Sequence, residues 1–268
     1  VPPQNVVAVS CATEGLYQIL ALIGAEADNV RNVVMPANTF IGAANAVLET
    51  PRLELRLCDV LRNSLNPTPL QIANSADHRT AAVLVQHFGG VARDLPLIDR
   101  LCQTGGMYLI EDCACAVATR VDGRAAGTFG AFGVWSFDAM KILTCGDGGL
   151  VYCRDAEHAA KIRRATRLGQ SSLSGRDATG ERWWEFEPTL PGRRAIMNDL
   201  QAAIGLVQLG KLPQMVAVRR LLWGQYHTRL AGAPGLLGTA PCAPAGVESS
   251  CYAYWIYHAH RDALARYL

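Results

Sequence analysis

Short apolar segments that alternate with longer helical patterns are the feature of this sequence that most restricts its fold. The apolar segments are residues 33–35, 81–85 and 107–110, and none of them contains a charged side chain. A strand that is apolar on both faces is typical of a parallel sheet that helices cover on both sides. The segments between them have helical periodicity, at residues 13–24, 40–49 and 95–103. The sequence therefore predicts a doubly wound α/β protein.

The remaining segments extend this pattern. Residues 53–57 alternate apolar and charged side chains, which predicts a half-exposed strand near an edge of the sheet. We predict two further strands at residues 132–137 and 149–152, then a helix at 155–167 with an acidic start and a basic end. The polar, glycine-rich stretch at 170–191 predicts a loop. The patterns at 198–209 and 214–230 predict two helices separated by Pro213, because proline interrupts helical hydrogen bonding.

The C-terminal part predicts a second, smaller domain. Residues 1–239 are expected to form one large domain, and residues 240–268 the start of a small one. The boundary stretch 240–250 is rich in proline, glycine and serine; a strand at 252–258 and a helix at 261–268 follow. The chain begins at Val1 rather than methionine and ends inside a helical pattern, so we expect termini that are missing here.

Composition limits the class of function. Half of the 268 residues are hydrophobic, which excludes a disordered chain and allows a large buried core. The formal net charge is only +2, so neither a nucleic acid nor a membrane surface is an expected partner. The apolar stretches are too short to span a bilayer, and nothing resembles a secretory signal.

The nine cysteines indicate reduced thiols in a cytoplasmic protein. They are an odd number, they mostly lie singly in apolar runs, and no C-x-x-C pair occurs. Cys113 and Cys115 form a C-x-C, which is too little for a metal site without other ligands. We therefore predict no metal site.

The turn at residues 10–15 is a candidate phosphate site. It follows a predicted strand at residues 6–9 and leads into a helix, where free backbone N–H groups, the Thr13 hydroxyl and the helix dipole favour an anion. It is not a P-loop, because no G-K-[ST] follows. The alternative is an ordinary helix cap by Ser10 or Thr13.

Two ionisable residues stand out at other strand ends, where ligands bind in open α/β sheets. Asp112 closes an apolar strand, and a buried carboxylate requires a cationic partner, which could also be a structural arginine. Lys141 has mostly apolar neighbours; a desolvated lysine is a Schiff-base nucleophile, and the alternative is a snorkelling surface lysine. His87 could be a base, but a packed or capping histidine is the favoured interpretation. Trp183 and Trp184 are better explained by packing.

Together these residues form one constellation. A phosphate cradle, an aromatic side chain, a buried carboxylate and a lysine are what pyridoxal 5′-phosphate (PLP) requires. That cofactor needs a lysine for its Schiff base and an acid at its pyridinium nitrogen.

Four motifs carry a resemblance to a known family. Residues 33–40 read V-V-M-P-A-N-T-F and residues 110–114 read I-E-D-C-A. Residues 136–141 read S-F-D-A-M-K, with Gly148-Gly149 following, and residues 197–206 read M-N-D-L-Q-A-A-I-G-L. In this order they resemble the motifs of the DegT/DnrJ/StrS family of sugar aminotransferases, which have the fold type I, aspartate-aminotransferase-like architecture. The resemblance implies a central, mostly parallel sheet flanked by helices and an incomplete small C-terminal domain.

The resemblance also implies a function and roles for particular residues. It implies a PLP-dependent aminotransferase that moves an amino group from glutamate or glutamine to a nucleotide-linked keto-sugar. The transfer would proceed through a Schiff base on Lys141. Lys141 would also shuttle the proton, Asp112 would pair with the pyridinium nitrogen, and Phe40 would stack on the ring. Ala12, Thr13 and Ser136 would hold the phosphate. The family implies a homodimer with a shared active site.

Three positions depart from the family's pattern. Cys115 stands where the family usually has Gln or His against the cofactor's 3-oxygen, and Ala12 replaces a glycine of the phosphate turn. Arg194 begins R-A-I where the family has N-Y-R before the methionine, and in the family that asparagine reaches the partner subunit's cofactor phosphate. These departures keep two alternatives open: a PLP-dependent sugar dehydratase or lyase on the same scaffold, and a catalytically degenerate regulatory paralogue. Related dehydratases carry histidine at the lysine position, so Lys141 favours transamination.

Overall fold

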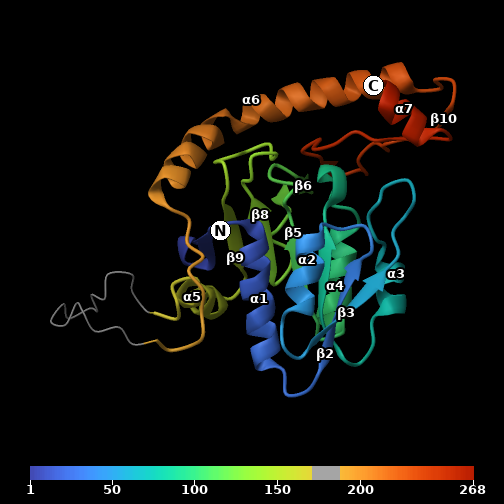
Figure 1. Cartoon of the computed structure of the whole chain (residues 1–268). Coiled ribbons are helices and arrows are strands. Elements are labelled where there is room, and N and C mark those ends of the chain that lie inside the picture. Colours follow the sequence, from blue (N-terminus) through green and yellow to red (C-terminus); the bar gives the residue numbers. More distant parts are fainter. Residues whose placement is uncertain (171–187) are drawn as a thin grey trace.

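The computed structural model describes residues 1–170 and 188–268 (Figure 1). Among these residues, a central seven-stranded sheet organises the chain. Its strands, in spatial order, are β1 (Val6–Val9), β9 (Gly149–Cys153), β8 (Phe132–Ser136), β5 (Tyr108–Asp112), β4 (Thr80–Gln86), β2 (Arg31–Pro36) and β3 (Leu53–Cys58). β9 runs antiparallel to both of its neighbours, whereas the other neighbouring pairs are parallel. The predicted, mostly parallel sheet is confirmed.

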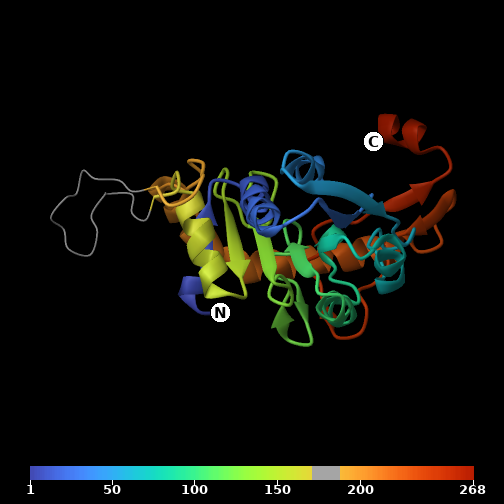
Figure 2. The same ribbon diagram turned by 90° about the horizontal axis from the view of Figure 1, so that it is seen from below.

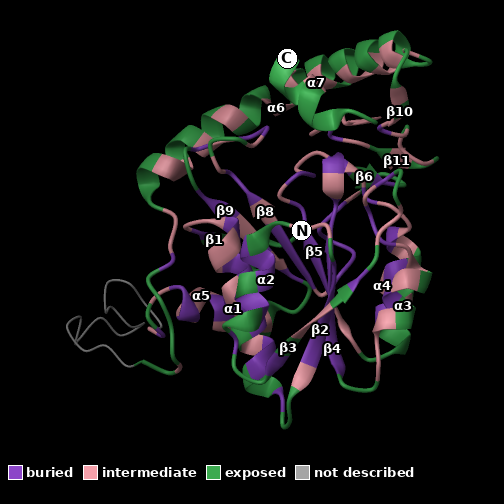
Figure 3. Cartoon of the chain, turned by 45° about the vertical axis from the view of Figure 1, so that its right-hand side comes forward, coloured by how far each residue is buried: buried purple, intermediate pink, exposed green. Residues whose placement is uncertain are grey.

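Helices cover both faces of the sheet, which explains the apolar strands (Figure 2). One face packs against α1 (Ala12–Glu26), α2 (Ile41–Leu48) and α5 (Ala156–Ala165). The other face packs against α3 (Pro69–Ser75) and α4 (Leu95–Thr104). β2 and β4 are buried along almost their whole length (Figure 3). The edge strand β3 is half-exposed, as predicted, but its exposure does not alternate: Glu54 and Leu57 are exposed, and only the end residues Leu53 and Cys58 are buried.

The prediction of two helices separated by Pro213 is wrong. The structure has one 32-residue helix, α6 (Asp199–Leu230), with Pro213 inside it; the helix bends along its length in Figure 1. Asn198 caps its start, because the Asn198 Oδ1 atom accepts a hydrogen bond from the Gln201 N–H at 2.9 Å. Proline removes one helical hydrogen bond, and packing offsets that loss: Val216 is buried, and Leu212 packs on the cluster of Phe137, Leu143 and Cys145.

The C-terminal segment also differs from its prediction. The strand expected at 252–258 is shortened to β12 (Ile256–His258), which pairs with β10 (Leu236–Thr239). Tyr252 cannot join that ladder, because its N–H donates to the Gly89 carbonyl at 3.1 Å and fixes it to the turn after β4. The predicted terminal helix is α7 (Arg261–Tyr267). A small sheet of β11 (Val247–Glu248), β6 (Arg120–Val121) and β7 (Arg124–Ala125), together with α3, was not expected.

The loop predicted at 170–191 lies largely outside the described residues. No helix in the described parts of the chain has the length and hydropathy needed to cross a bilayer.

Candidate active site

The carboxyl ends of β1, β8, β5, β4 and β2 meet at one edge of the sheet, and a cavity of about 570 Å³ opens there. Seven of the eight residues that the family resemblance assigns to the cofactor site line it: Ala12, Thr13, Phe40, Asp112, Cys115, Ser136 and Lys141. They come from segments that are far apart in the chain, so the topology of the sheet brings them together. Arg194 lies outside this set and is exposed.

The β1–α1 turn forms one end of the cavity. The alternative interpretation, a helix cap by Ser10 or Thr13, is wrong, because Cys11 caps α1 and its Sγ atom accepts a hydrogen bond from the Glu14 N–H at 3.4 Å. The Ala12 and Thr13 positions begin the helix, where backbone N–H groups have no partner inside it. A Cβ on Gly149 would lie 2.8 Å from the Ala12 nitrogen, so this glycine lets β9 approach the turn closely. The turn can therefore bind an anion.

Asp112 lies at the end of β5 and is only 4% exposed. Its Oδ1 atom accepts a hydrogen bond from the Ala114 N–H at 2.9 Å. Burial raises the pKa of the Asp112 carboxyl, and the Ala114 hydrogen bond and the charges of Lys141 and His87 act in the opposite direction. The cationic charge that acts most on this carboxylate thus comes from a lysine rather than from a structural arginine.

Lys141 follows β8 in a short, tightly bonded loop. Its N–H donates to the Asp138 carbonyl at 2.9 Å, and the Asp138 carboxylate accepts from the Met140 N–H at 2.9 Å. The Lys141 Nζ atom lies 5.3 Å from the centre of the Tyr252 ring, and the side chain lines the same cavity as Asp112. The lysine is half-buried, so it faces the cavity instead of snorkelling to the outer surface.

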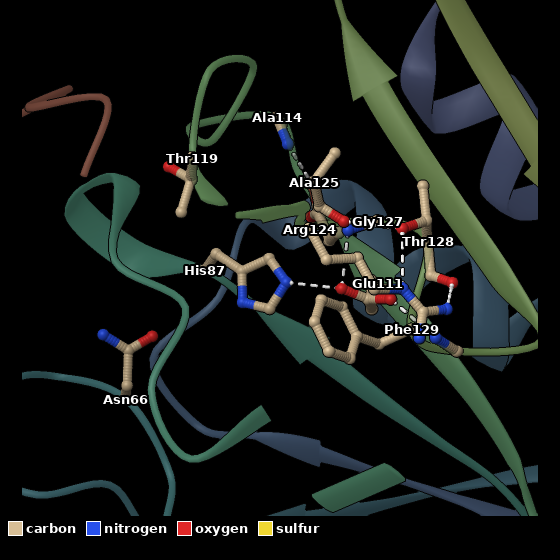
Figure 4. A network of polar contacts seen from close by, with 12 residues as sticks. Asn66, His87, Glu111, Ala114, Thr119, Arg124, Ala125, Gly127, Thr128 and Phe129 are labelled. Atoms are coloured by element: carbon tan, nitrogen blue, oxygen red, sulfur yellow. Dashed lines mark hydrogen bonds and ion pairs between the residues drawn. The ribbon is translucent and has the colours of Figure 1, made fainter. Parts of the chain in front are cut away.

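Glu111, the residue before Asp112, is fully buried on the opposite face of β5 (Figure 4). Its Oε2 atom lies 3.0 Å from His87 Nε2 and accepts the Gly127 N–H at 2.6 Å, and its Oε1 atom accepts the Gly130 N–H at 2.6 Å. His87 is therefore a packed histidine. With Cys113 nearby the group has metal-ligand types, but hydrogen bonds already occupy both carboxylate oxygens. The cluster acts as a clamp that joins the turn after β4, strand β5 and the loop before β8.

Replacing Glu111 by glutamine is expected to lower the free energy of unfolding by about 1–3 kcal/mol, because one of the two backbone donors would lose its acceptor. Urea unfolding of the purified variant measures this difference. Glu54→Gln is the matched control, since Glu54 is exposed and its contact with Arg79 is a 3.7 Å surface pair. Equal unfolding midpoints for the two variants would contradict the clamp.

Several cavity residues were not singled out from the sequence: Leu16, Asn38, Thr39, Gln86, Phe88, Ala114, Asp138, Asp147 and Tyr252. Gln86 could have been found, because a polar residue that ends an apolar strand gives the same signal as Asp112. Tyr252 could not, because it reaches the cavity through a contact with the turn after β4 that no local pattern encodes.

The fold and the cavity define the class of protein. A mostly parallel sheet with helices on both faces, and a lysine facing a buried carboxylate at its carboxyl edge, is the arrangement of fold type I transferases. The sequence profile described as the DegT/DnrJ/EryC1/StrS aminotransferase family matches residues 2–268. The chain belongs to this family and is an aminotransferase.

Three similar proteins illustrate the relationship. A dTDP-4-dehydro-2,3,6-trideoxy-D-glucose 4-aminotransferase of Saccharopolyspora spinosa is 40% identical over 99% of this chain and 69% of its own length. The crystal structure of the aminotransferase TlmJ from Streptoalloteichus hindustanus matches with a TM-score of 0.91 and 46% identity, over 99% of this chain and 70% of that one. DesV of S. venezuelae, solved in complex with a ketimine intermediate, matches with a TM-score of 0.84 and 26% identity, over 97% and 66%.

Proposed function

We propose that this protein uses PLP to transfer an amino group from glutamate or glutamine to a nucleotide-linked keto-sugar. The observation that carries the proposal is the cavity that Lys141 and Asp112 share with the N-terminus of α1. The similar S. spinosa protein acts on a dTDP-linked dehydro-sugar, which supports this substrate class. The DesV structure with its ketimine intermediate supports the cofactor.

The residues present fit PLP. The N-terminus of α1 with Thr13, together with Ser136, suits the phosphate; Asp112 suits the ring nitrogen, and Lys141 suits the aldehyde carbon. Two buried polar atoms that line this cavity, Gln86 Oε1 and Thr39 Oγ1, have no hydrogen-bond partner in the chain. Buried polar atoms are normally paired, so such atoms are consistent with a polar ligand.

Each of these side chains has a defined task in the proposed reaction. When bound, PLP supplies an aldehyde that condenses with amines and a ring that withdraws electrons. The Lys141 Nζ atom holds the cofactor covalently at rest, and as a free amine it moves a proton beside the ring. Asp112 keeps the ring nitrogen protonated, because an adjacent carboxylate raises the pKa of that nitrogen. Phe40, whose side chain is 61% exposed here, covers the ring face.

The functional test follows both half-reactions. Protein loaded with PLP should show a visible absorption band, and excess glutamate or glutamine should bleach it and release one equivalent of 2-oxoacid. Adding a nucleotide-linked keto-sugar should then restore the band and give an amino-sugar. Release of ammonia or loss of water from the sugar, without amine transfer, would identify a lyase or dehydratase instead. Neither that alternative nor a regulatory paralogue is favoured by the aminotransferases to which the chain is similar.

Our proposal includes a homodimer with a shared active site. Ala195 accepts the Ser10 N–H at 2.8 Å, and Arg193 lies 4.8 Å from the Tyr17 ring centre, so the segment before α6 is fixed against the start of α1. Arg194 is exposed beside them and outside its own cavity, which leaves it available to a second copy. The proposed division into 1–239 and 240–268 and a cytoplasmic location remain predictions.

Arg194→Ala is expected to raise the PLP dissociation constant about tenfold or more, since a charge-assisted phosphate contact is worth about 1.5–3 kcal/mol. Fluorescence titration with PLP measures this, and analytical ultracentrifugation gives the oligomeric state. Arg229→Ala, at an exposed position of α6, is the control. A monomer at micromolar concentration with unchanged PLP affinity would refute the shared site.

A further inference from the structure

Gln86 is the least explained polar residue of the cavity. It is the last residue of β4, it is 7% exposed, and its register partner on β5 is Asp112. The two side chains stand next to each other on the same face of the sheet and line the same cavity. The Gln86 Oε1 atom is buried and has no hydrogen-bond partner in the chain. A buried, unpaired carboxamide oxygen costs free energy, which indicates a polar group that the cavity receives from outside the chain.

The order of polar groups across the sheet indicates what that group is. Ser136 on β8 and the turn after β1 lie on one side of Asp112, and Gln86 on β4 lies on the other. In pyridoxal phosphate the ring nitrogen and the aldehyde carbon stand para to each other. The phosphate arm lies on one side of that axis and the ring 3-oxygen on the other. With Asp112 at the nitrogen and the phosphate towards β8 and β1, the 3-oxygen falls on the β4 side.

We propose that the Gln86 carboxamide binds the 3-oxygen of the cofactor ring; this inference rests on the proposed use of PLP. Half a turn of a carboxamide exchanges its oxygen and its NH₂ group with almost no change in shape. The NH₂ group then donates to the anionic ring oxygen, while the Oε1 atom turns away from the cavity. Gln86 thereby takes over, from a neighbouring strand, a contact that Cys115 is poorly suited to make.

The state of Cys115 is consistent with this arrangement. Burial raises the pKa of the Cys115 thiol to about 11, against the lowering effects of Lys141 and of a hydrogen bond with Gln86. Because that hydrogen bond lowers the thiol pKa, the Gln86 NH₂ group is its donor in this structure. The thiol is protonated at neutral pH, so after the half turn of the carboxamide its S–H group can donate to the Gln86 oxygen instead. A thiol itself is a weak donor, so the carboxamide is the stronger partner for an anionic oxygen.

The test uses the pH dependence of the visible band of PLP-loaded protein. The ring oxygen shares a proton with the nitrogen attached at the aldehyde carbon. A hydrogen-bond donor to that oxygen weakens this sharing and lowers the pKa of the nitrogen, which the visible band reports. Gln86→Met, of similar length, is expected to raise the pKa of the band by about half a unit to one unit. Gln86→Glu should raise it further, because it places a negative charge there. PLP should bind about three- to tenfold more weakly to both variants.

The controls separate this inference from the proposed function. Gln225→Met and Gln225→Glu change an exposed residue of α6 and should titrate like the unaltered protein. The titratable residues that line the cavity are Cys11, Asp112, Cys115, Asp138, Lys141, Asp147 and Tyr252. They are unchanged in every variant, and only Gln86→Glu adds a further carboxyl to them. If the unaltered protein binds no PLP, the proposed function fails. If it binds PLP and the Gln86 and Gln225 variants titrate alike, the inference fails. Should Gln86→Met not fold, Gln86→Asn carries the same test, since its shortened arm also loses the contact.

Discussion

Lys141→Ala is expected to abolish transamination while the protein still binds PLP non-covalently. The variant loses the amine that holds the cofactor and the base that moves the proton, and general acid–base catalysis alone contributes about 10²–10⁴ in rate. Thr13, Ser136 and the N-terminus of α1 also line the cavity and are unchanged, so phosphate binding should persist. Single-turnover kinetics with excess amino donor measure the rate, and equilibrium dialysis measures PLP binding.

Covalent attachment provides an independent readout. Borohydride reduction of PLP-loaded protein, followed by peptide mass spectrometry, should locate the label on Lys141 and should give no label at this position in the variant. Lys161→Ala is the matched control, because Lys161 is a surface residue of α5 that contacts Glu26 and Glu157. Full activity of Lys141→Ala, or a label on another lysine in the unaltered protein, would exclude the proposed mechanism.

Asp112→Asn is expected to bind PLP yet to convert it to pyridoxamine phosphate several orders of magnitude more slowly. The substitution keeps shape and volume but removes the charge that holds the ring nitrogen protonated, and each ~1.4 kcal/mol of lost transition-state stabilisation is a factor of ten. Asp112→Glu should be partly active at best, because its longer arm misplaces the charge. Single-turnover conversion with excess glutamate or glutamine is the assay, and Asp28→Asn, on the exposed turn after α1, is the control.

Stability separates this role from a merely structural one. Burial raises the Asp112 pKa above its unfolded value, so the folded state binds the proton more tightly than the unfolded chain does. The contribution of Asp112 to stability is then fully present below the unfolded pKa and is lost as the pH rises through the folded pKa. Without PLP at neutral pH, Asp112→Asn should therefore be at least as stable to urea as the unaltered protein. A clear loss of stability combined with a normal rate would make Asp112 a structural partner.

The sheet could be predicted from the sequence because burial on both faces leaves a local signal. Residues 33–35 of β2, 81–85 of β4 and 108–110 of β5 are apolar, and residues 53–57 of the edge strand β3 alternate apolar and charged side chains. The sequence predicts a break in α6 at Pro213, because proline removes a helical hydrogen bond. Tertiary packing, which the local sequence does not report, keeps the helix continuous. The position of Tyr252 depends on a hydrogen bond to Gly89, more than a hundred and sixty residues earlier in the chain, and no local pattern reports such a contact.

The site was predictable to the extent that its residues follow strands. Asp112, Ser136 and the turn at Ala12 come directly from strand ends, and parallel strands bring such ends to one edge. The cap on α1 could not be predicted, because cysteine is an uncommon cap. Ser10 and Thr13, which stand on either side of the Cys11–Ala12 pair, are of the residue types that usually cap helices. Gln86 and His87 both follow the apolar residues of β4, and the local sequence does not show which of them enters the site; the structure places His87 against Glu111 and Gln86 in the cavity.

The two adjacent carboxylates of β5 make the alignment of this strand intolerant of error. Successive side chains of a strand face opposite sides, so a shift of one residue would bring Glu111 into the cavity and turn Asp112 towards Gly127 and Gly130. The longer Glu111 side chain would then stand beside Gln86, and the shorter Asp112 side chain could not span the distance to the N–H groups of both Gly127 and Gly130. An insertion or deletion of a single residue in β5 would thus damage folding and chemistry together, so neither could be recovered by substitutions in the cavity alone.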